Sequence, residues 1–188
     1  ASAAADELLD RLGPHRVVVV LGSGWAPVAE RLGTVTASLP ATSLTGVPAP
    51  TVPGHDGVIH SVDAEGADGT VPTLVMAGRA HLYEGHPVAT VVHLVRAAVL
   101  SGCTTVVLTN AAGSLRSEVG IGEPVLISDH LNLTGSNPMC GPTPSAGMPS
   151  RFVDLTDLYS VGLRDAVRAE QPDLVEGVYA GLLGGSFE

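Results

Sequence analysis

The sequence predicts an α/β fold in which one central β-sheet is flanked by helices. Segments with strand-like and helix-like hydrophobic patterns alternate along the 188 residues, 45% of the residues are hydrophobic, and polar or glycine-rich loops follow several strand-like segments. A chain of this length can bury one sizeable core. Because no internal repeat or linker divides it, we expect a single domain over residues 1–188.

The first third of the chain predicts a helix, a strand and a second helix. Residues 1–12 place three leucines on one side and end at Gly13-Pro14, which predicts a helix. The β-branched run at 16–21 predicts a central strand that is covered on both faces. Residues 27–32 suit the start of a helix, whereas 40–57 are rich in Pro, Gly and Thr and predict a loop.

The middle of the chain predicts a pair of strands and the clearest helix. Residues 58–62 and 71–76 have strand-like patterns and are joined through a turn around Asp68-Gly69. Residues 87–100 predict a helix, because a proline opens the segment and five valines repeat at helical spacing. The valines expected to share its packed face are Val88, Val91, Val92, Val95 and Val99.

The last part of the chain predicts three more strands and a helix. Residues 104–109 read as a buried strand, 124–128 and 177–182 as further strands, and 154–170 as mainly helix. The intervening residues 135–150 contain four prolines and three glycines, which predicts a long loop.

Charge and composition exclude several classes of function. The net charge is −10 and all nine basic residues are scattered arginines, so we expect no nucleic acid partner. No apolar run reaches the roughly 18 residues of a membrane helix, and we expect no secretory leader. Cys103 and Cys140 form neither a disulfide framework nor a metal-ligand spacing, so we expect a cytoplasmic protein without a metal site.

Three loops at predicted strand ends carry the candidate chemistry: Gly22-Ser23-Gly24, Gly78-Arg79-Ala80-His81 and Asn110-Ala111-Ala112-Gly113. Ligands of α/β sheets bind beyond the carboxyl ends of strands, so we expect these loops to share one pocket. The first loop offers backbone N–H groups and a hydroxyl before a helix, which suits an anion. It is equally compatible with a plain tight turn, since it lacks the lysine of a P-loop.

The other two loops also have plainer interpretations. Arg79, His81 and Tyr83 lie on one side of an extended segment, and Glu84 is placed to orient the imidazole. The alternative is a surface arginine beside a structural histidine. The small residues at 110–113 suit either a ligand against the backbone or tight packing of a strand on a helix.

Six segments in order are far more specific than any one of them. They are Val20-Leu21-Gly22-Ser23-Gly24-Trp25, Val52-Pro53-Gly54-His55, Gly78-Arg79-Ala80-His81-Leu82-Tyr83-Glu84-Gly85, Leu108-Thr109-Asn110-Ala111-Ala112-Gly113, Ile127-Ser128-Asp129-His130-Leu131-Asn132-Leu133 and Gly184-Gly185-Ser186-Phe187-Glu188. With them the chain resembles the trimeric purine nucleoside phosphorylases of the actinobacterial type. The resemblance implies the mixed, twisted central sheet of the nucleoside phosphorylase fold.

The resemblance also implies a role for each matched residue. Phosphate would be held by Ser23, Arg79, His81 and the backbone N–H of Ala111, with His55 on a gate above it. The nucleoside would be bound by Tyr83, Ala112, Gly113, Phe152, Phe187 and Glu188. Of these residues, Phe152 would cover the ribose of a neighbouring subunit, and His81 and Glu188 would act in catalysis. Asp129 and His130 also match the family pattern, and we interpret them as structural.

The implied reaction is reversible phosphorolysis of purine ribo- and deoxyribonucleosides to the free base and (deoxy)ribose 1-phosphate, a step of purine salvage. Glu188 would accept hydrogen bonds from purine N1–H and the 2-amino group, which favours inosine and guanosine over adenosine. Inorganic phosphate would be the co-substrate and no cofactor is expected. The implied assembly is a homotrimer.

The sequence departs from the family pattern at its end. Members of the family continue beyond the position of Glu188, so we expect residues 1–188 to form one nucleoside phosphorylase domain that is incomplete at its C-terminus. Two alternatives therefore stay open. One is a related 5′-methylthioadenosine phosphorylase, and the other is a truncated phosphate-binding protein without full catalytic activity.

Overall fold

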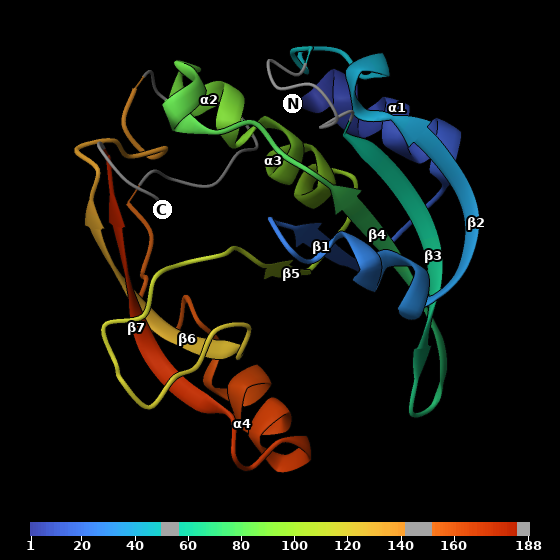
Figure 1. Cartoon of the computed structure of the whole chain (residues 1–188). Helices are drawn as coiled ribbons and strands as arrows, with labels where there is room; N and C mark the ends of the chain where they lie inside the picture. Colours follow the sequence, from blue (N-terminus) through green and yellow to red (C-terminus); the bar gives the residue numbers. More distant parts are fainter. Residues whose placement is uncertain (50–56, 142–151, 184–188) are drawn as a thin grey trace. The chain divides into compact units, whose positions relative to one another are not determined.

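The computed structural model describes residues 1–49, 57–141 and 152–183, and they form two compact units (Figure 1). The first unit is Ala1–Ala111, and the second consists of the described residues from Ala112 onward. Each unit contains one β-sheet. Among the described residues, no helix combines the length and the apolar character that crossing a membrane requires. The expectation of a single domain stays a prediction.

The first unit contains a five-stranded mixed sheet with the strand order β2-β3-β4-β1-β5. Its strands are β1 (Val17–Leu21), β2 (Gly33–Pro40), β3 (Val58–Gly66), β4 (Gly69–Ala77) and β5 (Thr105–Leu108). β1 lies between β4 and β5 and is parallel to both, whereas β3 is antiparallel to β2 and β4. A central mixed sheet with helices confirms the predicted α/β fold class.

Helical segments pack on both faces of this sheet. The helical segments of the first unit are α1 (Ser2–Leu12), α2 (Val88–Val91), α3 (His93–Leu100) and the 3₁₀ turns η1 (Ala26–Arg31), η2 (Ala41–Ser43) and η3 (Leu82–Glu84). α1 and α3 pack against one face, where Val18 and Val20 of β1 are buried (Figure 1). η1 packs on the other face, against Val19 and Leu21. The alternation of side chains along a strand therefore explains why four consecutive valines and a leucine suit β1.

Two expectations for the first unit are wrong in detail. No strand was expected at 33–40, yet β2 pairs with β3 there. The helix expected at 87–100 is interrupted at Val92, whose φ is −88° and ψ 1°, and Val99 is 48% exposed. Its buried residues are instead Ala97 and Ala98. Small side chains let α3 approach the sheet and α1 closely, whereas a run of β-branched valines is a weak helix former.

The strand expected at 104–109 is present as β5, but it is not buried. Val106, Val107 and Leu108 are 36–63% exposed. The reason lies in its place in the sheet, because within the described residues β5 pairs with β1 alone. An edge strand leaves part of its apolar side chains uncovered by the sheet.

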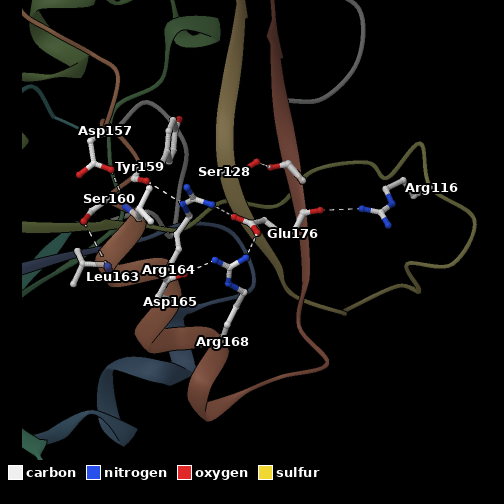
Figure 2. A network of polar contacts seen from close by, with 12 residues as sticks. Arg116, Ser128, Asp157, Tyr159, Ser160, Leu163, Arg164, Asp165, Arg168 and Glu176 are labelled. Atoms are coloured by element: carbon white, nitrogen blue, oxygen red, sulfur yellow. Dashed lines mark hydrogen bonds and ion pairs between the residues drawn. The ribbon is translucent and has the colours of Figure 1, made fainter.

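The second unit contains two parallel strands and one helix. β6 (Val125–Leu133) pairs with β7 (Val175–Leu182), and a register shift between Ile127 and Asp129 leaves Ser128 in a bulge. α4 (Val161–Glu170) is shorter than the helix expected at 154–170. Residues 154–160 are irregular because the side chains of Asp154, Asp157 and Ser160 accept hydrogen bonds from nearby backbone N–H groups. In Figure 2, Arg164 and Arg168 of α4 reach Glu176 of β7.

Candidate functional site

The candidate phosphate loops leave three adjacent parallel strands at the same edge of the first sheet. In the register of the sheet, Leu21 of β1 is level with Ala77 of β4, and Val20 is level with Leu108 of β5. Because the strands are parallel, the segments 22–24, 78–81 and 109–111 all start at their carboxyl ends. This is the edge of an α/β sheet at which ligands bind.

Gly22 is the point at which these three segments meet. A Cβ atom at this position would lie 2.4 Å from the carbonyl oxygen of Thr109, 2.7 Å from Nη1 of Arg79 and 2.9 Å from Cα of Asn110. Real Cβ atoms do not approach other heavy atoms so closely. A side chain at position 22 would therefore collide with its neighbours, so glycine is needed there. The backbone after β1 is in direct contact with the backbone after β5.

Thr109 ties the three segments together with hydrogen bonds. Its hydroxyl accepts from the backbone N–H of Gly22 at 2.9 Å and donates to the carbonyl of Val20 at 3.1 Å. Its carbonyl oxygen accepts from Nη1 of Arg79 at 3.3 Å. The Arg79 guanidinium is thus held across the ends of β1, β4 and β5. Thr109 stood inside a recognised motif, but sequence reasoning assigned it no role, because its partner Gly22 is 87 residues away.

His81 is oriented by the carboxylate of Glu84. Nδ1 of His81 lies 2.7 Å from Oε1 of Glu84, and the same oxygen accepts the backbone N–H of His81 at 2.9 Å, which closes a capping box on η3. An ionised carboxylate only accepts hydrogen bonds, so Nδ1 carries a proton. In the imidazolium form Nε2 is also a donor, which is the form that suits an anion.

Two neighbours complete the surroundings of this imidazole. The ring of Tyr83 stacks on the ring of His81, with centroids 4.6 Å apart and planes 19° apart. Nε2 of His86 lies 3.8 Å from Oε2 of Glu84. Sequence reasoning missed His86, although its spacing of two residues from Glu84 was a visible signal. Tyr83 is 64% exposed, so it presents one ring face to the histidine and a large open surface.

The other predicted site residues lie as follows. Ser23 is exposed in the turn after β1, where the Trp25 N–H donates to the Gly22 carbonyl at 3.1 Å, and Ala111 is exposed in the segment after β5. Ala112, Gly113 and Phe152 belong to the second unit and are exposed there. His55, Phe187 and Glu188 lie outside the described residues. In the part of the chain that the structure describes, no three His, Cys, Asp or Glu side chains gather as they would around a metal ion.

The chemistry of the groups in the first unit suits an anion. A guanidinium, an oriented imidazole and a glycine-rich turn lie on the ends of three parallel strands, in a chain of net charge −10. Arg79 therefore places a guanidinium at this edge of an acidic protein. In the comparison with protein families, the model of the phosphorylase superfamily matches residues 16–188.

The chain belongs to the phosphorylase superfamily. Two of its phosphorylase relatives are the purine nucleoside phosphorylases of Mycobacterium tuberculosis, 50% identical over 190 residues, and of Cellulomonas sp., 47% identical over 191 residues. Both alignments cover 100% of this chain, with 66% of the first relative and 65% of the second. The chain therefore spans about two thirds of the length of these relatives.

Solved structures of phosphorylases resemble the fold. The crystal structure of the purine nucleoside phosphorylase from Schistosoma mansoni in complex with acetate has a TM-score of 0.81 and 28% identity to this chain. The structural alignment covers 100% of this chain and 70% of the Schistosoma mansoni chain. The family resemblance noticed in the sequence is thereby confirmed.

Proposed function

We propose that the protein is a purine nucleoside phosphorylase. It would cleave purine ribo- and deoxyribonucleosides with inorganic phosphate, reversibly, to the free base and (deoxy)ribose 1-phosphate. The observation that carries the proposal is the junction at Gly22, where Thr109 and Arg79 are held across the ends of three parallel strands. Family membership and the names of the relatives support the same reaction.

In the proposed site, phosphate is bound by Ser23, Arg79, His81 and the N–H of Ala111, with His55 above it. A planar guanidinium matches two phosphate oxygens, and its contact with the Thr109 carbonyl holds it in place before phosphate arrives. Breaking the bond from C1′ to the purine nitrogen leaves positive charge on the ribose. Phosphate fixed in line with that bond stabilises this charge and attacks C1′. The departing purine keeps the bonding electron pair and gains the proton that hydrogen phosphate loses overall.

The proposed nucleoside site uses Tyr83, Ala112, Gly113, Phe152, Phe187 and Glu188. Tyr83 contacts the ribose beside the phosphate, because its ring stacks on the imidazole of His81. Glu188 accepts hydrogen bonds from N1–H of a 6-oxopurine, so inosine and guanosine are the expected substrates. Phe152 covers the ribose bound by a neighbouring subunit, which requires an oligomer, and the family resemblance implies a homotrimer. The enzyme acts in the cytoplasm with phosphate as co-substrate and without a cofactor.

The deciding experiment measures release of hypoxanthine from inosine as a function of phosphate concentration. The proposal expects saturable release that is absent without phosphate, and a similar rate with guanosine but not with adenosine. A panel that includes 5′-methylthioadenosine tests the specificity. Rapid cleavage of that compound with none of inosine would replace the proposal with a methylthioadenosine phosphorylase. Phosphate binding by calorimetry without turnover of any nucleoside would leave a phosphate-binding protein.

A further inference from the structure

We propose that Tyr159 and Arg164 are positioning residues that fix segment 152–160, and with it Phe152, on the two strands of the second unit. This inference rests on the proposed function, in which Phe152 covers the ribose. Sequence reasoning gave Tyr159 and Arg164 no role and read His130, which Tyr159 contacts, as structural.

Tyr159 joins the segment to β6 through its side chain. Its hydroxyl lies 3.1 Å from Nδ1 of His130, and the two rings meet edge to face with centroids 5.7 Å apart. Burial raises the pKa of Tyr159, as do the negative charge of Asp129 and the neighbouring Tyr179. The phenol therefore stays protonated at neutral pH and shares a hydrogen bond with Nδ1 of His130. This contact places the C-terminal end of segment 152–160 on the first strand of the pair.

Arg164 joins the same residue to β7 through the backbone. Its Nε donates to the carbonyl of Tyr159 at 3.0 Å, and its Nη1 pairs with Oε1 of Glu176 (Figure 2). Side chains of Arg164 and Glu176 are 18% and 23% exposed, so this ion pair is largely shielded from water. One guanidinium thus bridges the irregular segment and a strand. Tyr159 is held from both sides, by β6 at its hydroxyl and by β7 at its carbonyl.

Hydrogen-bonded turns connect Tyr159 with the start of the segment, where Phe152 lies. The Leu158 N–H donates to the carbonyl of Leu155 at 3.1 Å, and the side chain of Asp154 accepts from the N–H and hydroxyl of Thr156 at 2.9 and 2.6 Å. Asp154 is two residues from Phe152, which is 89% exposed. Because these turns are consecutive, a displacement of Tyr159 would move the chain that presents Phe152.

The neighbouring Arg168 offers a matched control. It also pairs with Glu176, at 2.9 Å from Oε2, and it bonds Asp165 in its own helix, but these contacts do not include the carbonyl of Tyr159. Arg164→Lys keeps the charge and removes the fork that reaches two partners. Arg168→Lys makes the same chemical change on the same carboxylate. A difference between the two variants therefore reports on the bridge to Tyr159.

The test compares Tyr159→Phe, Arg164→Lys and Arg168→Lys in the full-length protein. We expect the first two to raise the KM for inosine by about 3- to 10-fold, as loss of one hydrogen bond implies, with the KM for phosphate unchanged. Arg168→Lys should change neither constant. In a Phe152→Ala background, Tyr159→Phe should have no further effect on the inosine KM, because both changes act through the same ring. Additive effects would show a merely structural role and overturn the proposal.

Hydrogen exchange of the Thr156, Leu158 and Val161 amides separates this inference from the proposed function. Exchange should be faster in Tyr159→Phe and Arg164→Lys and unchanged in Arg168→Lys. Unchanged exchange in the first two variants would overturn the tether itself. Faster exchange with an unchanged inosine KM would overturn the positioning role while the proposed function stands. A wild-type protein without any phosphorolysis would overturn both.

Discussion

Nδ1 of His81 and Oε1 of Glu84 are 2.7 Å apart, and that oxygen also accepts the backbone N–H of His81. One carboxylate therefore fixes the imidazole and the backbone that carries it. The side chains of His81 and Glu84 are 14% and 9% exposed, so water competes weakly for this contact. The other oxygen of the same carboxylate, Oε2, lies 3.8 Å from Nε2 of His86.

Glu84→Gln is expected to weaken phosphate binding through His81. The amide is similar in size but lacks the charged oxygen that accepts hydrogen bonds from the ring and the backbone N–H of His81, so the KM for phosphate should rise by about 3- to 10-fold. Initial rates at varied phosphate measure it. Glu65→Gln is the matched control, since this exposed carboxylate lies near the opposite end of the β3–β4 pair. Equal phosphate KM values in both variants would separate Glu84 from the proposed site.

Arg79→Ala is expected to raise the KM for phosphate by about 10- to 100-fold, the range that loss of a charged hydrogen-bond donor implies. Arg79→Lys should recover only part of this effect, because a lysine cannot hold the Thr109 carbonyl and two phosphate oxygens with one planar group. The measurement is phosphate saturation at fixed inosine. Arg31→Ala, at an exposed arginine of η1, tests for a general effect of charge. A normal phosphate KM in Arg79→Ala would remove the residue from the site.

Gly22→Ala is expected to destabilise the fold by about 1–3 kcal/mol, because the new methyl group overlaps backbone atoms of Thr109 and Asn110. Loss of activity should accompany it, since the collision also involves the Arg79 side chain. Gly24→Ala makes the same change two residues away, where no atom lies within 4 Å but φ is +83°, and should cost about 1 kcal/mol. Urea unfolding of both variants measures which of them has lost more stability. A more stable Gly22→Ala than Gly24→Ala would contradict the crowded junction.

His15 is expected to make stability depend on pH. It is 6% exposed, and its Nε2 lies 2.9 Å from the hydroxyl of Ser61. Burial lowers the pKa of His15, although a hydrogen bond to Gly13 and the charge of Asp63 partly oppose this. The unfolded state thus binds a proton more readily than the folded state.

The sign follows from that difference in pKa. The stabilisation from a neutral, buried His15 is complete above its unfolded pKa of about 6.5 and is lost as pH falls toward the lower folded pKa. The free energy of unfolding should decrease by at most about 1.4 kcal/mol per pH unit in this window. Urea unfolding at several pH values between 5 and 7 gives the free energy of unfolding as a function of pH. Its slope against pH should be smaller in His15→Gln than in the wild-type protein. Identical slopes in the two proteins would contradict the assignment to His15.

Local patterns were sufficient for much of the fold. The valine run of β1, the hairpin strands β3 and β4, and the glycine-rich loop after β1 could be predicted because each depends on residues close together in the sequence. The six ordered motifs were sufficient to recognise the family, which the match over residues 16–188 confirms. The roles assigned to individual site residues stay predictions.

Other features depended on contacts that no local pattern contains. β2 was missed because its polar and small residues form a strand through pairing with β3, and the helix at 87–100 breaks at Val92 because packing favours Ala97 and Ala98 over the valine face. Residues that are distant in the sequence but adjacent in the fold therefore determine where this strand forms and where this helix breaks.

The sequence by itself determined which hydrogen-bond donors follow which strands, because each strand and the glycine or arginine after it are neighbours in the sequence. Only the tertiary structure decided that the N–H of Gly22 donates to the hydroxyl of Thr109, 87 residues away. It also decided that the guanidinium of Arg79 donates to the carbonyl of Thr109. The physical reason is that parallel pairing of β1 with β4 and β5 brings remote strand ends within hydrogen-bonding distance. Periodicity carries no information about which strands become neighbours.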